Sequence, residues 1–310
     1  MCGYGYSCQV MLPLYQKVRE VKVADAVKWL VESNEPFHGS VFTGIPDLYD
    51  VYGFRSTQEV GINQRADDYK EWFNQVAEAI FRRLPPGQCA LFSQTDGKIL
   101  DTEGRVICWL DKSVLLSNAA TKYGCTLLWH KIAIDTSAEI SSHRPCYTHL
   151  LAFGNQFTYH TRHFRTPDVF NRGQMTWEKA TGINVCIIGI SFLHYVVHTP
   201  VVINPFCGRG TILAIANCFG LSALGVEIAT KRAKRAGQRD LRGDFLAIPV
   251  ETLKVLGVRQ DVLTLIDCSE STEVASEQAG DTGEGDEMWS SEMVGGEDEG
   301  GSGDEGSGDS

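Results

Sequence analysis

One stretch of the sequence, residues 201–236, constrains the fold more than any other. It opens with the apolar, β-branched run Val201–Ile203, which has the composition of a buried parallel strand. The residues NPFCGRGT follow as a tight turn with two glycines, and Thr211–Phe219 then reads as an apolar helix. A second short apolar run, Ala223–Val226, leads directly into Glu227. This order of strand, glycine turn, helix, strand and acid predicts a Rossmann-like βαβ unit.

The turn and the acid suit a nucleoside ligand. Gly208 and Gly210 let the backbone approach a ligand and tolerate positive φ. The helix behind them offers free N–H groups and the positive end of its dipole. Glu227 follows Gly210 by 17 residues, near the spacing of about 20 at which an acid takes the ribose hydroxyls. A single G-x-G favours a nucleoside without a pyrophosphate.

NPFCGRGT and GVEI resemble the D-P-F-x-G-S-G-T and G-x-E-I segments of class I S-adenosylmethionine (SAM) methyltransferases. The arrangement is most similar to the permuted N4/N6 amino-methyltransferases (DNA methylases), over about Val18 to Arg242. The resemblance implies SAM as cofactor, with Glu227 on its ribose and with turn residues Asn204, Pro205, Phe206, Gly208, Gly210 and Thr211 around it. Asn204 stands where the family has Asp, which weakens an acceptor for the methionine amino group. The alternative is an ordinary βαβ unit whose glycines serve packing only.

A strand near the N-terminus adds a further implied cofactor residue. Val18–Val23 alternates in polarity, and Asp25 follows it before a short helix, 26–32. In the family an acid at this place reaches the adenine amino group. Asp25 also fits an ordinary helix N-cap, and the two roles are compatible.

The segment SVFTGIPD, residues 40–47, resembles the catalytic motif T-[DNS]-P-P-[YFW] at the end of the fourth strand. Thr43 and Pro46 match the Thr and the second Pro. Gly44, Ile45 and Asp47 replace the polar acceptor, the first Pro and the aromatic residue. The acceptor for a target amine and the ring that stacks on a flipped base are therefore missing from their places. The implied catalytic residues are Thr43, Gly44, Pro46 and Asp47.

Asp47 offers a different chemistry at this place. Its carboxylate can accept a hydrogen bond or a proton from a nucleophile during in-line methyl transfer. Tyr49, Tyr52 or Phe54 can supply the missing stacking surface, and Tyr49 is the first candidate. The alternative is an Asx-type turn in which Asp47 bonds its own backbone.

Basic residues interleaved with aromatic ones predict contact with nucleic acid. Residues 155–174 read as a long loop with Arg162, Arg165 and Arg172 among four aromatic residues, a pattern in which rings stack on bases and Arg meets phosphate. The alternative is a surface loop whose rings pack on the core. The helix after Glu227 adds a basic face that suits a polyanion: Lys231, Arg232, Lys234, Arg235, Arg239 and Arg242.

Periodicity predicts the remaining elements. We expect helices over 66–84 and 110–123, and a long apolar helix from Thr176, whose hydroxyl suits an N-cap. We expect strands over 89–93, 126–134 and 147–153, the last two as an antiparallel hairpin at the sheet edge. The family places the segment Met175–Trp177 beside the cofactor.

The net charge of −11 hides two different regions. Residues 270–310 hold fourteen of the 39 acidic residues and no Lys or Arg. Residues 1–269 therefore hold the other 25 acidic residues and all 28 Lys and Arg. Such a Gly/Ser-rich acidic segment cannot bury enough apolar surface to fold. We expect a domain over 1–269 and a disordered tail that is either solubilising or an interaction segment.

Several classes of protein lack support. The ten cysteines form no C-x-x-C pair, so reduced thiols in an intracellular protein, cytoplasmic or nuclear, are expected. His130 has no second ligand at metal spacing, so no metal is expected. No run of about 18 uncharged apolar residues predicts a membrane span.

These observations predict one α/β domain: a Rossmann-like mixed seven-stranded sheet in circularly permuted order, with helices on both faces. The expected activity is SAM-dependent methyl transfer to nucleic acid, with RNA (tRNA included) ahead of DNA because the base-flipping motif is broken. The alternatives are methylation of a protein or a small molecule, and a SAM-binding scaffold that acts through its acidic tail.

Overall fold

The computed structural model describes residues 18–48, 62–100, 103, 105–135 and 145–264. The chain divides into two units, Met1–Asp267 and Cys268–Ser310, and all of the described residues belong to the first. The acidic tail lies outside them, so its disorder stays a prediction.

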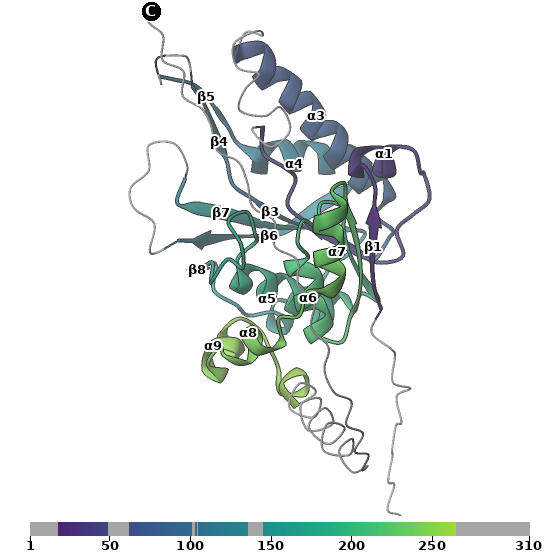
Figure 1. Cartoon of the computed structure of the whole chain (residues 1–310), viewed down its shortest axis with the longest axis vertical. Helices are drawn as coiled ribbons and strands as arrows, with labels where there is room; N and C mark the ends of the chain where they lie inside the picture. Colours follow the sequence, from purple (N-terminus) through teal and green to yellow (C-terminus); the bar gives the residue numbers. More distant parts are fainter. Residues whose placement is uncertain (1–17, 49–61, 101–102, 104, 136–144, 265–310) are drawn as a thin grey trace, which may run out of the picture. The chain divides into compact units, whose positions relative to one another are not determined.

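A mixed sheet of eight strands forms the centre of the described unit, in the order β1-β10-β9-β2-β3-β7-β6-β8 (Figure 1). The strands are β1 Arg19–Val23, β2 Ser40–Thr43, β3 Cys89–Gln94, β6 Cys125–Ile134, β7 Tyr147–Asn155, β8 Val169–Asn171, β9 Val201–Asn204 and β10 Ser222–Glu227. Pairing is parallel from β1 to β3 and between β6 and β8, whereas β7 runs antiparallel to both of its neighbours. The central strand β9 comes late in the chain, which confirms the permuted order. The five parallel strands β1, β10, β9, β2 and β3 end at one edge, called here the carboxyl edge.

The sheet has one strand more than the seven predicted. β8 pairs with β6 inside the segment 155–174, which the sequence predicted to be irregular. The Ile132 N–H donates to the Asp168 carbonyl (2.7 Å) and the Arg172 N–H to the Ile134 carbonyl (2.9 Å), which extends this pairing at both ends. Three residues are too few for their alternation to stand out in the sequence. A two-stranded ribbon, β4 Gly97–Leu100 with β5 Val106–Leu110, was also not predicted.

Helices cover both faces of the sheet (Figure 1). One face carries α1 Ala26–Val31, α3 Ile62–Arg83 and α4 Lys112–Lys122. The other carries α5 Ile183–Phe192, α6 Thr211–Cys218, α7 Thr230–Gln238, α8 Arg242–Leu246 and α9 Val250–Val255. Strand side chains alternate between the two cores: in β3, Cys89 and Leu91 pack with α5 and α6, whereas Ala90 and Phe92 pack with α3. Burial on both faces explains why the central strands are continuous apolar runs.

The apolar helix α5 begins later than predicted. It starts after Gly182 and has no side-chain cap, because the Thr176 hydroxyl instead lies 3.0 Å from the Thr211 hydroxyl. A Cβ at Gly182 would overlap the Arg172 carbonyl, so β8 and α5 approach at a position that only glycine fills. The helix continues as a π-helical turn, Leu193–Val197.

Two findings bear on the expected protein class. Within the described ranges, no helix combines the length and the apolar character needed to cross a lipid bilayer. Seven cysteines lie in these ranges, and all are free thiols.

Candidate active site

The glycine turn lies at the carboxyl end of β9, between the ends of β10 and β2. Asn204 is buried, and its Oδ1 accepts hydrogen bonds from the Thr43 hydroxyl (2.8 Å) and the Phe206 N–H (3.2 Å). The Cys207 N–H donates to the Val226 carbonyl at 3.0 Å, which fixes the turn to β10 as well. An amide oxygen has two lone pairs. Both are used inside the protein, so Oδ1 of Asn204 has none left for the methionine amino group of a cofactor.

The two glycines of the turn have different neighbours. Gly208 and Gly210 have φ of 55° and 82°, in the region that favours glycine. A Cβ at Gly210 would lie 2.8 Å from the Cα of Ala236 in α7, so this glycine serves helix packing. A Cβ at Gly208 would meet only the ring of Trp177, at 3.1 Å. Gly208 is therefore the position where a ligand can approach the backbone. Trp177, expected beside the cofactor, lies next to this glycine.

Arg209 adds a functional group that the sequence analysis did not single out. It replaces the Ser of the family motif, and its guanidinium carbon lies 4.9 Å from the centre of the Trp177 ring. Its Nε is buried and has no hydrogen-bond partner among the described residues. A buried donor without a partner is rare, so this atom is a candidate contact for a ligand. The departure from Ser was the signal in the sequence.

The other predicted turn residues have mainly packing contacts. Pro205 and Thr211 are buried, and Thr211 is the first residue of α6. The Phe206 ring meets Trp72 of α3 edge to face, with centroids 6.5 Å apart. These three residues shape the turn and hold it between the two helical layers.

Glu227 ends β10 and is only 7% exposed. Its Oε1 accepts from the Ala229 N–H (2.9 Å) and from Nε and Nη2 of Arg232 (2.9 and 2.7 Å). All three bonds go to one oxygen, and no described residue donates to Oε2. The carboxylate is thus held in a fixed position with one oxygen available at the carboxyl edge.

Asp25 lies next to Glu227 in space. Val23 is in register with Glu227 across β1 and β10, and the Ala24 N–H donates to the Glu227 carbonyl at 3.2 Å. Oδ1 of Asp25 caps α1 by accepting from the N–H groups of residues 27 and 28 at 2.9 and 3.2 Å. The N-cap interpretation is confirmed. Because the cap uses only Oδ1, Oδ2 remains for a ligand.

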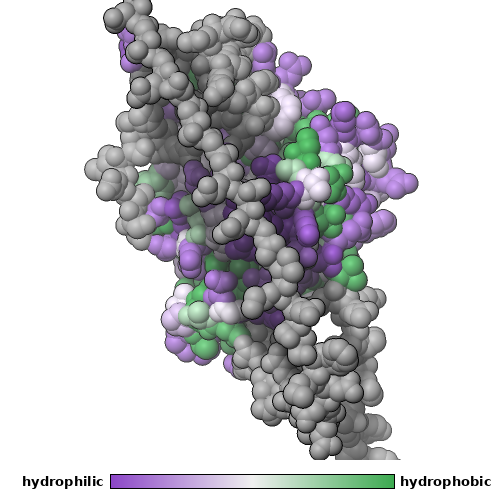
Figure 2. Space-filling model, in the orientation of Figure 1, coloured by the Kyte–Doolittle hydropathy of each residue, from purple (hydrophilic) through white to green (hydrophobic). Residues whose placement is uncertain are grey.

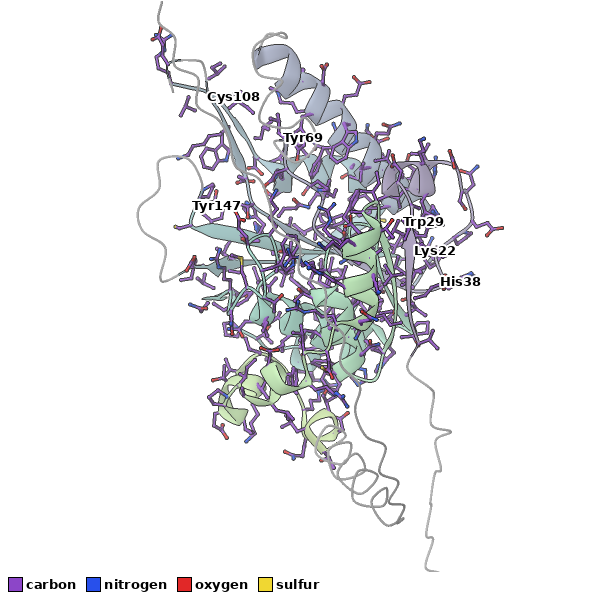
Figure 3. The ribbon with its side chains drawn as sticks, in the orientation of Figure 1. Lys22, Trp29, His38, Tyr69, Cys108 and Tyr147 are labelled. Carbon is purple, nitrogen blue, oxygen red and sulfur yellow. The ribbon has the colours of Figure 1, made fainter. Side chains whose placement is uncertain are left out.

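The predicted catalytic segment, residues 43–47, leaves β2 at the carboxyl edge, beside the glycine turn. Thr43 is fully buried and bonds to Asn204. The buried Gln94 amide, oriented by its partners, donates to the Ile45 carbonyl at 3.2 Å and accepts from the Ile45 N–H. The Tyr69 hydroxyl donates to the Pro46 carbonyl at 2.8 Å. Tyr69 projects from α3 and is labelled in Figure 3. The main chain of this segment is therefore held from β3 and α3.

Gly44 and Asp47 have different surroundings. A Cβ at Gly44 would lie 3.0 Å from the Ser93 carbonyl oxygen, so a side chain there is crowded. Asp47 forms an ion pair with Lys112, the first residue of α4. The Asp47 side chain is 50% exposed and that of Lys112 is 2% exposed. The carboxylate is thus reachable from solvent while its partner is not.

A buried polar cluster lies behind this ion pair. Asp96, two residues after β3, accepts from the Lys112 N–H (3.0 Å), Tyr147 hydroxyl (3.0 Å), His149 Nε2 (3.0 Å) and Trp109 Nε1 (3.3 Å). Tyr147, labelled in Figure 3, comes from the start of β7. Burial alone raises the pKa of Asp96. The opposing effects are larger and lower this pKa to about 2: they are the hydrogen bonds from His149 and the Lys112 N–H, the charge of His149 and the hydrogen bond from Tyr147.

Of the three arginines predicted in the loop 155–174, one lies near the carboxyl edge. Arg172 follows β8 and forms an ion pair with Asp135. β7 runs antiparallel to β3, so β7 ends at Asn155 on the edge of the sheet opposite to the carboxyl edge. Arg162 and Arg165 follow in the chain from that opposite edge. Both of these arginines are exposed. They are not gathered with the catalytic segment.

The aromatic residues of the same loop were expected to stack on bases, and this expectation is wrong. Phe157, Tyr159 and Phe164 pack against Phe192 at the end of α5, with centroids 6.4, 5.4 and 5.0 Å away. Phe170 is buried in the core. Burying these large apolar rings stabilises the fold, so they pack against the core and are not left exposed to stack on a ligand. Tyr49, Tyr52 and Phe54 lie outside the described residues.

Comparison with known proteins gives a fold. No protein-family profile and no curated protein matches the chain. The cytosine-N4-specific DNA methyltransferase PvuII matches with a TM-score of 0.55 and 14% identity, over 78% of this chain and 92% of its own. A protein from Thermus thermophilus assigned as a DNA modification methylase, solved with S-adenosyl-L-methionine, matches with a TM-score of 0.53 and 20% identity, over 73% and 94%. The chain has a methyltransferase fold.

Within the methyltransferase fold, the predicted cofactor and catalytic segments lie on adjacent strand ends, β9 and β2. The Rossmann-like architecture expected from NPFCGRGT and GVEI is confirmed. At these identities the roles of single residues rest on the geometry above.

Proposed function

We propose that this chain is a SAM-dependent methyltransferase that acts on nucleic acid. The observation that carries the proposal is the 2.8 Å bond between Thr43 and Asn204, which joins the end of β2 to the end of β9, where the glycine turn begins. A methyl donor on one strand end then lies next to an acceptor on the neighbouring one, the arrangement that in-line transfer needs. The solved methyltransferase fold with bound SAM supports the choice of cofactor.

The residues at the carboxyl edge fit SAM. Oε2 of Glu227 suits the ribose hydroxyls, and Oδ2 of Asp25 suits the adenine amino group. Gly208 leaves its backbone open to a ligand, and the buried Nε of Arg209 suits a carboxylate such as that of the methionine moiety. SAM supplies a methyl group on a sulfonium centre. The protein's part is to bind it, orient it and exclude water around it.

The target half of the site lies over Gly44–Asp47. Oxygen atoms of Asp47 can accept a hydrogen bond from the N–H or O–H group that takes the methyl. Gly44 and Pro46 shape the floor of this site, with Pro46 held by Tyr69. Tyr49 stays our candidate for a stacking ring.

A nucleic acid target agrees with the charge on the surface. α7 buries only Ala233 and Ala236 and exposes Lys231, Lys234 and Arg235. On the face seen in Figure 2, hydrophilic residues lie among apolar patches. A basic face of this kind attracts a polyanion. Arg172, at the carboxyl edge, is the best placed of the predicted loop arginines for a phosphate.

The solved relatives bear on which nucleic acid is tested first. The broken base-flipping motif favoured RNA, but both relatives named above are DNA enzymes by name, and no comparison supports RNA. DNA is therefore the first substrate to test, with RNA beside it. Methylation of a protein or small molecule, and a SAM-binding scaffold, remain the alternatives.

The test is transfer of labelled methyl from SAM into unmodified DNA, total RNA and total protein, with wild type and Asp47→Ala. Incorporation into DNA or RNA that falls in the variant supports the proposal. Incorporation into protein alone overturns the nucleic acid target. Binding of SAM without any transfer would favour the scaffold, and absence of SAM binding in calorimetry would overturn the cofactor.

Nucleic acid binding adds a second measurement. If Arg172 meets phosphate, Arg172→Ala should weaken DNA binding and reduce its dependence on salt, with a log–log slope change of about 1. Arg162→Ala, on the opposite edge, is the matched control. Equal effects of the two variants would contradict the placement of the substrate at the carboxyl edge.

A further inference from the structure

Lys112 has an environment that its sequence position does not suggest. It is the first residue of α4, and its side chain is 2% exposed. Lysine is almost never this buried without a partner, because removing an ammonium from water is costly. Its partner is the carboxylate of Asp47, in the catalytic segment.

The backbone of Lys112 is fixed as firmly as its side chain. Its N–H donates to Asp96 Oδ1 at 3.0 Å. Asp111, the N-cap of α4, accepts from the Val114 N–H at 3.0 Å and fixes the first turn of the helix. The Lys112 ammonium also lies 5.9 Å from the centre of the Tyr69 ring. Lys112 therefore reaches the catalytic segment from a rigid helix end.

Asp96 is held in turn by three residues from two other elements. Tyr147 and His149 come from β7, and Trp109 from β5. His149 Nδ1 lies 2.8 Å from Nε2 of His130 in β6. Ligand atoms of Asp96, Asp111 and His149 lie within 4.8 Å of one another. Both oxygens of Asp96 and both ring nitrogens of His149 are already used, so hydrogen bonding explains this cluster better than a metal ion.

We propose that Lys112 is a positioning residue for methyl transfer: it fixes the Asp47 carboxylate at the mouth of the active site, and Asp96 fixes Lys112. The proposal rests on the proposed function and adds a residue to it. Asp47 stands where the related motif has an aromatic ring, so nothing in the motif itself orients a carboxylate. A single charged contact with a rigid helix supplies that orientation.

The test compares Lys112→Met with Lys122→Met. Methionine keeps the length and apolar stem of lysine and removes the charge. Lys122 lies on the same helix and also bonds a carboxylate, Glu78, at 2.6 Å, but its side chain is 61% exposed. Three quantities are measured for each variant: the SAM dissociation constant, kcat and KM for methyl transfer, and backbone hydrogen exchange of residues 43–48 and 201–206.

We expect Lys112→Met to lower kcat by about 10- to 100-fold, the scale of a small misplacement of a reacting group. The SAM dissociation constant should stay within about threefold, because the cofactor contacts lie on other residues. Exchange should rise in residues 43–48 and stay unchanged in 201–206. Lys122→Met should match wild type in every measurement. The double variant Asp47→Ala with Lys112→Met should be no slower than Asp47→Ala alone.

Each other result overturns the proposal. Unchanged exchange in 43–48 would show that Lys112 does not hold the segment. Loss of SAM binding with a general rise in exchange would assign Lys112 to fold stability. If wild type transfers no methyl group, the proposed function fails, and the exchange comparison still decides whether Lys112 holds Asp47.

Discussion

The Thr43 hydroxyl donates to Oδ1 of Asn204 at 2.8 Å, across 161 residues of sequence. Both side chains are buried, at 0% and 3% exposure. One residue ends β2 and the other ends β9, so the bond joins the two segments on which the proposed reaction depends. It also orients Asn204 so that the same oxygen accepts from the Phe206 N–H.

Thr43→Val should therefore lower the unfolding free energy by about 1–3 kcal/mol, because a buried acceptor loses one of its two donors. The glycine turn should also loosen, and SAM affinity should fall several-fold. Urea unfolding and calorimetry measure the two effects. Thr43→Ser keeps the hydroxyl and should recover most of both. A serine variant as weak as the valine variant would show that the methyl group of Thr43, rather than the bond, matters.

Glu227→Ala should weaken SAM binding by about 10- to 100-fold, since a carboxylate that accepts hydrogen bonds contributes about 1.5–3 kcal/mol. Arg232→Ala is the matched control, because Arg232 contacts only the other oxygen of the same carboxylate. Its effect should be much smaller. Comparable losses in the two variants would mean that the ion pair, and not Oε2, determines affinity.

The two glycines of the turn should respond differently to alanine. Gly210→Ala must fit a Cβ against the Ala236 backbone at φ 82°, so it should destabilise the fold by at least about 1–3 kcal/mol. Gly208→Ala is also strained, at φ 55°, but its Cβ meets only Trp177, so it should destabilise the fold less than Gly210→Ala and reduce SAM affinity more. Thermal unfolding with and without SAM separates the two. The reverse ranking would contradict the packing role of Gly210.

Asp96 makes the fold sensitive to acid. Its folded pKa of about 2 lies below the usual 3.8. A carboxyl with a lowered folded pKa stabilises the fold above its unfolded pKa, and that contribution is lost as the pH falls through the folded value. Between pH 4 and pH 2, wild type should lose about 2 kcal/mol more unfolding free energy than Asp96→Asn. Urea titrations across this window measure it.

The control for that experiment is Asp67→Asn. Asp67 is 70% exposed and pairs with Lys70 one turn along α3, so its removal should leave the acid-dependent loss as large as in wild type. An identical loss in wild type and Asp96→Asn would show that the cluster does not hold Asp96 in its charged form.

Much of the fold could be predicted from local patterns. Residues close together in the sequence are enough to indicate some elements. Examples are the β-branched runs of β9 and β10, the glycines between β9 and α6, and the amphipathic periodicity of α3. Weak local signals failed. β8 has three residues, and α5 begins at an uncapped glycine because Gly182 must pass close to Arg172.

Side-chain partners could not be predicted from spacing. The rings of Phe157, Tyr159 and Phe164 looked available for bases until the packing against Phe192 was known. Nor could the sequence show that Nε of Arg209 is buried without a hydrogen-bond partner among the described residues, because this depends on which residues pack around it.

The sequence by itself determined the permuted methyltransferase architecture and the positions of Glu227, the glycine turn and the diverged TGIPD segment. These follow from residue types at fixed local spacing. Only the tertiary structure decided that Thr43 bonds Asn204, that Gly210 serves packing, and that a buried Lys112 holds Asp47. Such contacts join residues far apart in the chain, and burial and hydrogen bonding select them only once the sheet has formed.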